Sequence, residues 1–147
     1  MKKLVNIGFA TAILAIAFMS CNDNNDDFPE INEVNRVAID SIEIMKDSVE
    51  VDSMEVNAIQ KIITYSDYAQ GCEGFYGYDY QIEDFDRLVT AYKYKTNSSC
   101  GQPKALPWNF DFRPNQTGTY NFKFWKGKDS LDADVWIEKT IVVVDSL

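Results

Sequence analysis

The most regular feature of this sequence is an alternation of apolar and polar residues that continues, with few breaks, from residue 37 onward. Successive side chains of a β-strand point to opposite faces, so a period of two predicts strands that bury one face. The clearest runs span residues 76–82, 88–96, 108–112 and 120–124. Less regular runs span residues 37–44, 49–51, 54–63 and 135–144. The pattern predicts an all-β domain of about seven or eight strands.

The composition also favours strands over helices. Aromatic residues make up 14% of the chain, and aromatic and β-branched side chains fit the pleated, half-buried surface of a sheet. Turn-forming residues separate the alternating runs, as in residues 114–118 (PNQTG). The chain of 147 residues is long enough for one domain preceded by a tether.

Two of the runs, residues 76–82 and 88–96, are predicted to form a hairpin centred on Asp86. This register pairs the tyrosines of the two strands directly: Tyr78 with Tyr94, and Tyr80 with Tyr92. It also places Cys72 and Cys100 opposite each other just beyond the open end of the hairpin. These two cysteines are an even pair, and we expect them to form a disulfide in an oxidising compartment.

The first residues have the features of a secretory signal. Lys2 and Lys3 precede an apolar run at residues 4–19, and Ser20 and Cys21 follow it. The apolar run is shorter than the roughly 20 residues that a membrane-spanning helix needs. The segment 17–21 (AFMSC) resembles a bacterial lipobox, in which the cysteine is acylated and becomes the new N-terminus. Residues 1–20 are therefore expected to be a signal peptide and Cys21 the site of lipidation.

The residues after Cys21 are rich in Asn and Asp. Such a start resembles the surface lipoproteins of Bacteroidota, in which acidic residues after the cysteine accompany export to the outer face of the outer membrane. The resemblance implies an outer-membrane lipoprotein that faces the cell surface or the periplasm. Residues 21–36 are predicted to be an acidic tether, and the domain is predicted to span residues 37–147.

A further resemblance concerns residues 117–122 (TGTYNF). They are similar to the start of the sixth strand of immunoglobulin-like domains, where a tyrosine hydroxyl bonds back to nearby backbone. With the strand count, this implies an immunoglobulin-like antiparallel β-sandwich. No cysteine follows Tyr120 at the antibody-type position, so the antibody-type variant is not expected. A lipocalin-like barrel is the alternative, but its long strands would need more residues.

Charge and missing residue types exclude several functions. A formal net charge of −9 argues against binding nucleic acid or anionic lipid headgroups. The chain has no histidine, which removes the commonest zinc ligand and the usual general base. No nucleophile elbow, phosphate loop or Cys–His pair is found, so no enzyme, cofactor or metal site is predicted.

Two sets of residues are candidate sites. Five serines follow an aspartate and precede an apolar residue, which resembles the O-glycosylation motif of exported Bacteroidota proteins; they are Ser41, Ser48, Ser53, Ser130 and Ser146. The same pairs also suit turns beside strands. Four aromatic residues are expected near one end of the sandwich, where they form either a binding patch or part of the rim: Tyr65, Tyr68, Trp125 and Trp136.

These observations predict a membrane-attached domain that binds a partner protein or a glycan. The alternative is a structural accessory subunit of an outer-membrane complex, and a small enzyme is the least favoured hypothesis. Nothing in the sequence identifies the partner.

Overall fold

The computed structural model of the protein describes residues 29–46 and 49–145. The predicted signal peptide, Cys21 and the first half of the predicted tether therefore lie outside the described residues. No helix in the described ranges is long and apolar enough to cross a membrane.

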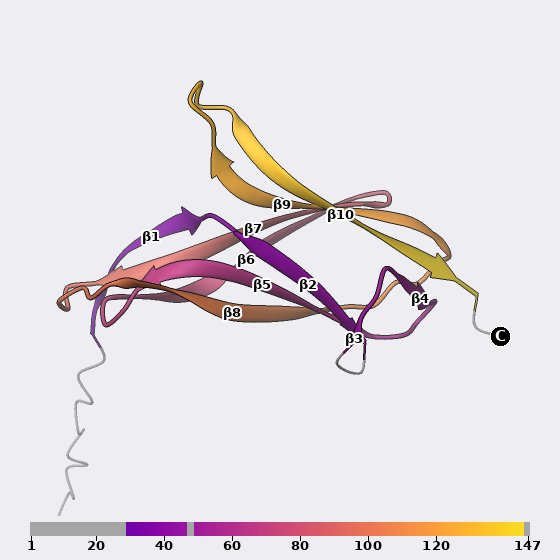
Figure 1. Cartoon of the computed structure of the whole chain (residues 1–147), viewed down its shortest axis with the longest axis horizontal. Helices are drawn as coiled ribbons and strands as arrows, with labels where there is room; N and C mark the ends of the chain where they lie inside the picture. Colours follow the sequence, from indigo (N-terminus) through magenta and orange to yellow (C-terminus); the bar gives the residue numbers. More distant parts are fainter. Residues whose placement is uncertain (1–28, 47–48, 146–147) are drawn as a thin grey trace, which may run out of the picture.

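In the described part of the chain, ten strands form two sheets (Figure 1). The first five strands are β1 (Ile31–Val37), β2 (Ser41–Lys46), β3 (Val49–Glu50), β4 (Ser53–Glu55) and β5 (Gln60–Ala69). The other five are β6 (Glu73–Glu83), β7 (Asp86–Thr96), β8 (Pro103–Phe112), β9 (Gly118–Lys128) and β10 (Asp134–Val144). The predicted all-β sandwich is confirmed. The count exceeds the prediction because β1 lies mostly before the first predicted run and because the predicted run at residues 54–63 is divided between β4 and the start of β5.

The smaller sheet has the order β3-β2-β5-β8, and all its pairings are antiparallel. The larger sheet has the order β1-β7-β9-β10-β4, with β6 also paired to β7. Strand β6 occupies one edge of β7 along most of the length of β7. The other edge of β7 is shared by β1 and β9, which pair with different parts of it. Two pairings are parallel, β7 with β9 and β4 with β10, and these differ from the fully antiparallel sandwich that the sequence predicts.

The core lies between the two sheets and is built from the alternating positions of their strands. Strand β5 buries every second residue from Gln60 to Tyr68, and β9 buries Tyr120, Phe122 and Phe124. The ring of Phe112 on β8 meets those of Tyr120 and Phe122 edge-on, at centroid distances of 5.1 and 4.9 Å. The aromatic positions of the sequence therefore join the two sheets directly.

The predicted tyrosine contact at the start of β9 is confirmed. The hydroxyl of Tyr120 donates a hydrogen bond of 3.0 Å to the backbone carbonyl of Gln116. This contact ties the loop before β9 to the strand itself, as in immunoglobulin-like domains.

The chain crosses between the sheets soon after β1. Val37 pairs with Ala91 in the larger sheet, and Ser41 pairs with Tyr65 in the smaller one. Between them, the Ile39 N–H donates to the Trp125 carbonyl at 3.0 Å, and the Asp40 N–H donates to the Tyr65 carbonyl at 2.8 Å. The segment is thus bonded to both sheets.

Two predictions about the chain need correction. The predicted tether ends too late, because β1 already begins at Ile31 and pairs with β7. The first six side chains of β1 are exposed, so the strand is held by backbone hydrogen bonds and has no buried alternation to reveal it.

The predicted hairpin exists, but its register is wrong. Strands β6 and β7 turn at residues 84–85, so Tyr78 faces Ala91 and Tyr80 faces Val89. Asp84 adopts φ 51°, a left-handed conformation that Asp tolerates better than most residues. A register shift between Phe75 and Gly77 then moves the pairing by one residue. The predicted tyrosine pairs are therefore not formed.

The predicted disulfide between Cys72 and Cys100 is confirmed, with its Cα atoms 4.9 Å apart. The backbone N–H of Thr96 donates to the carbonyl of Cys72 at 2.8 Å. This hydrogen bond joins the two arms of the hairpin next to the disulfide. Cys100 lies beyond the end of β7. The residues between Thr96 and Cys100 allow the disulfide to form although the register of the hairpin differs from the predicted one.

Candidate functional site

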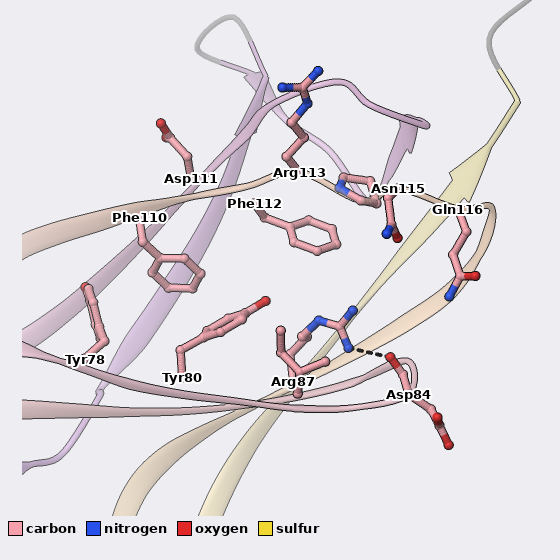
Figure 2. A pocket seen from close by; sticks show the side chains of 12 residues that line it. Tyr78, Tyr80, Asp84, Arg87, Phe110, Asp111, Phe112, Arg113, Asn115 and Gln116 are labelled. Carbon is pink, nitrogen blue, oxygen red and sulfur yellow. Dashed lines mark hydrogen bonds between the residues drawn. The ribbon is translucent and has the colours of Figure 1, made fainter.

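A pocket of about 710 Å³ opens between the edge strands β6 and β8 and is the candidate functional site (Figure 2). This volume lies within the range typical of sites for small ligands, about 300–1,000 Å³. Its aromatic side comes from Tyr78 and Tyr80 on β6 and from Phe110 and Phe112 on β8. Its polar end comes from Arg87 on β7 and from the amides of Asn115 and Gln116.

The pocket exists because each of its walls is the edge of a sheet. In the described residues, β6 pairs only with β7, and β8 pairs only with β5. The inward side chains of these edges therefore meet each other across the open side of the sandwich. Strand β8 also contains Pro103 and Pro107, and proline within a sheet is confined to edge strands, strand starts and bulges.

Aromatic rings bridge the two sheets along this open side. Phe75 of β6 stacks on Trp108 of β8 with ring centroids 4.6 Å apart. Further along, the Phe110 ring meets Tyr78 at 5.1 Å and Tyr80 at 5.6 Å, both edge-on. These contacts close the sandwich above the pocket and hold the ring positions of its aromatic wall.

Arg87 lies at the polar end of the pocket and is 8% exposed. Its Nη1 donates to the backbone carbonyls of Asp84 at 2.7 Å and Asp86 at 2.8 Å. Its guanidinium also lies over the Tyr120 ring, 4.8 Å from the centroid. No carboxylate of the described residues forms an ion pair with it.

The other charged residues of the lining point elsewhere. Figure 2 shows the side chains of Asp111 and Arg113 on the far side of β8, and the carboxylate of Asp84 directed away from the rings. Arg113 donates from Nε to the carbonyl of Asn57 at 3.1 Å. Arg87 is therefore the charged group that faces the pocket interior.

The two tyrosines of the pocket keep their hydroxyl protons at neutral pH. Burial raises the pKa of Tyr78, against a smaller opposing effect of the hydrogen bond of 2.7 Å that it shares with Thr64. Burial also raises the pKa of Tyr80, and the nearby positive charge of Arg87 only partly offsets this. The aromatic wall is uncharged, and its hydroxyls remain hydrogen-bonding groups.

The predicted patch of four aromatic residues is not formed. Tyr68 is 1% exposed in the core, where burial raises its pKa to about 12. Tyr65 lies on the opposite face of β5 and donates to Glu43 at 3.2 Å. Trp125 and Trp136 pair with each other across the β9–β10 hairpin, in the other sheet. The prediction failed because Tyr65 and Tyr68 are an odd number of positions apart on β5, so they point to opposite faces, and because the two tryptophans belong to the other sheet.

The Trp125 side chain is a structural contact. Its Nε1 donates to Asp134 at 2.9 Å, and the guanidinium of Arg36 lies 4.5 Å from its ring centroid. The hydrogen bond from Trp125, reinforced by Arg36, holds the pKa of the Asp134 carboxyl below its usual value. These contacts fasten β1 to the β9–β10 hairpin.

The acidic loop before β10 is also bonded internally. Asp129 accepts from the N–H groups of Leu131 and Ala133 at 2.8 and 3.0 Å, and Asp132 pairs with Lys128 at 2.9 Å. Within residues 29–46 and 49–145, no group of three or more acidic, histidine or cysteine side chains is arranged to hold a metal ion.

The candidate glycosylation serines stay predictions. Ser41, Ser53 and Ser130 are exposed and therefore accessible to a modifying enzyme. Ser48 and Ser146 lie outside the described residues.

Sequence reasoning identified the aromatic faces of β6, β8 and β9 but not the pocket or Arg87. The alternating pattern shows which side chains point inward, yet not which strands end as sheet edges. One signal was present: Arg87 is in phase with Val89 and Ala91, the buried alternate positions of β7.

Comparison with protein-family models, with curated proteins and with solved structures returned no match to this chain.

Proposed function

We propose that this protein is a lipid-anchored protein of the outer membrane whose β-sandwich domain binds a glycan in the pocket between β6 and β8. The observation that carries the proposal is the composition of that pocket. Four aromatic rings form one side, and a guanidinium and two amides form the other.

This arrangement suits a sugar because a pyranose has both apolar faces and polar edges. Its C–H faces pack on rings such as Tyr80 and Phe110, and its hydroxyls need donors and acceptors at fixed positions. The amides of Asn115 and Gln116 each provide both. The pocket volume of about 710 Å³ accommodates a small number of sugar units.

Glycan binding is tested by titrating the protein with a broad oligosaccharide panel, followed by calorimetry or by NMR. We expect at least one binder whose affinity falls at least about tenfold in Phe110→Ala, since a buried aromatic contact is lost. Tyr76→Ala is the control, because Tyr76 is 59% exposed on β6, the facing edge strand, and does not line the pocket. A panel without any binder contradicts the proposal.

Attachment of the protein to the membrane through a lipid is tested separately. A Cys21→Ala variant should lose acyl labelling and leave the membrane fraction, because the lipid chains supply the anchoring energy. Protease treatment of intact cells then separates a surface-facing domain from a periplasmic one. If the protein instead copurifies with a stoichiometric envelope subunit and binds no glycan, the accessory-subunit hypothesis replaces this proposal.

A further inference from the structure

We infer that the pocket selects a sugar that carries a carboxylate, a uronate unit, and that Arg87 is the partner of this carboxylate. The inference rests on the proposed glycan-binding function and specifies the class of glycan.

The hydrogen bonding of Arg87 leaves one side of its guanidinium available. Nη1 is bonded to the carbonyls of Asp84 and Asp86, which fixes the plane of the group. A guanidinium has five N–H donors; the two carbonyls use two of them and the Tyr80 hydroxyl accepts from one more, so two donors remain. Two parallel donors on one side of a guanidinium match the two oxygens of a carboxylate.

The electrostatic state of Arg87 also favours an anionic ligand. It is 8% exposed, and its hydrogen-bond and ring contacts within the described residues are with backbone carbonyls, the Tyr120 ring and the Tyr80 hydroxyl. A buried charge without an opposite charge is costly, and a bound carboxylate would remove this cost. The chain as a whole has a formal net charge of −9, so any preference for an anion must come from this local group.

The remaining lining favours a sugar carboxylate over that of a peptide. The ring of Tyr80 lies beside Arg87, with the Phe110 ring on its other side, and the amides of Asn115 and Gln116 lie at the polar end of the pocket (Figure 2). A uronate places its carboxylate at the edge of a ring whose faces are apolar and whose other edge carries hydroxyls. The carboxylate, the apolar faces and the hydroxyls of a uronate therefore correspond to the guanidinium, the aromatic rings and the amides of the pocket.

The test compares methyl glucuronide with methyl glucoside, which differ only in having a carboxylate or a hydroxymethyl group at one carbon. Titration of the isotope-labelled protein is followed by NMR, including the Nε–H signal of Arg87. We expect the glucuronide to bind about 10- to 100-fold more tightly, as for hydrogen bonds to a charged group. The Arg87 Nε–H signal should shift with the glucuronide and stay in place with the glucoside.

Two variants assign the preference to Arg87. In Arg87→Gln the preference for the glucuronide should disappear, and in Arg87→Lys it should shrink, because an ammonium lacks the planar pair of donors. Arg36→Gln removes one positive charge on the outer side of the sheet, beside Trp125, and should leave the preference unchanged. If the Arg87 variants do not fold, the comparison of the two sugars on the unaltered protein still tests whether the pocket prefers a carboxylate.

Each of the other possible results contradicts a specific part of the two proposals. Equal binding of the two sugars overturns the selection of a carboxylate and leaves glycan binding intact. Binding of an acetylated glutamate peptide without either sugar overturns the uronate and the proposed function together, in favour of a peptide ligand. Absence of binding by any sugar or peptide overturns both.

Discussion

At the scale of single residues, the core contains a polar side chain that its surroundings do not satisfy. Gln60 is 1% exposed on β5, directly opposite Phe112 of β8. Neither its amide nitrogen nor its amide oxygen has a hydrogen-bond partner among the described residues. An amide buried without partners costs free energy that an apolar side chain of similar size would avoid.

We therefore predict that Gln60→Met raises the free energy of unfolding by about 1–2 kcal/mol. The measurement is urea unfolding followed by fluorescence. Gln102→Met is the control, because Gln102 is exposed and should change stability little. A loss of stability in Gln60→Met would show that the amide is satisfied by a group other than protein, such as an enclosed water.

A second residue-scale prediction concerns two glycines. Gly118 begins β9 with φ 147°, and a Cβ added there would clash with the Phe85 ring. We expect Gly118→Ala to destabilise the fold by about 2 kcal/mol or more, through strain and the ring clash. Gly77 in β6 has no atom within 4 Å of an added Cβ. Gly77→Ala should be neutral or stabilise by up to about 1 kcal/mol, and equal losses in both variants would contradict this account.

At the scale of elements, the β6–β7 hairpin depends on its disulfide. The bridge joins Cys72 and Cys100 across a sequence separation of 28. A closed loop of this length stabilises by roughly 3–4 kcal/mol through the reduced entropy of the unfolded chain. The double variant Cys72→Ser, Cys100→Ser should lose about that amount in urea unfolding. The same loss should appear when the unaltered protein is unfolded under a reducing agent, and no difference between oxidised and reduced protein would contradict it.

The elements were mostly predictable, but their pairing was not. The alternation around Tyr120 and Phe122 predicted a strand with a buried aromatic face, since the local period decides which side chains point inward. The register of the β6–β7 hairpin depends instead on which of Asp84 and Asp86 occupies the turn, and on one extra residue near Gly77. Both aspartates suit a turn, so the sequence does not distinguish the two registers.

The candidate site was less predictable than the strands. Its rings were visible as the inward positions of β6 and β8, but the pocket requires that both strands be edges facing each other. That depends on long-range pairing, which a local pattern does not contain. Arg87 was likewise hidden, because its partners are backbone carbonyls and the ring of Tyr120.

At the scale of the whole molecule, one buried tyrosine and two half-buried tyrosines link stability to alkaline pH. Burial raises the pKa of Tyr68 to about 12, and it also raises the pKa values of Tyr78 and Tyr80. The folded state therefore favours the neutral phenols. Their contribution is complete below the unfolded pKa of 10.0 and is lost as pH rises through the higher folded values.

We predict that the free energy of unfolding falls between about pH 10 and pH 12. Urea unfolding across this range measures the fall, and absorbance of the phenolate reports when each class of tyrosine ionises. Tyr68 should ionise only near the upper end of this range or on unfolding. Tyr68→Phe should flatten the fall, and simultaneous ionisation of all tyrosines in the folded protein would contradict the prediction.

The crossing of the chain between the sheets has a mechanical consequence. Residues 37–41 are bonded to the larger sheet at Trp125 and to the smaller sheet at Tyr65. A tensile load applied upstream of Ile31 and directed along β1 would act in shear on its register with β7, so its hydrogen bonds would resist together. The load would then be divided between both sheets. Force arriving from the N-terminal side would be spread through the sandwich before it reached the pocket.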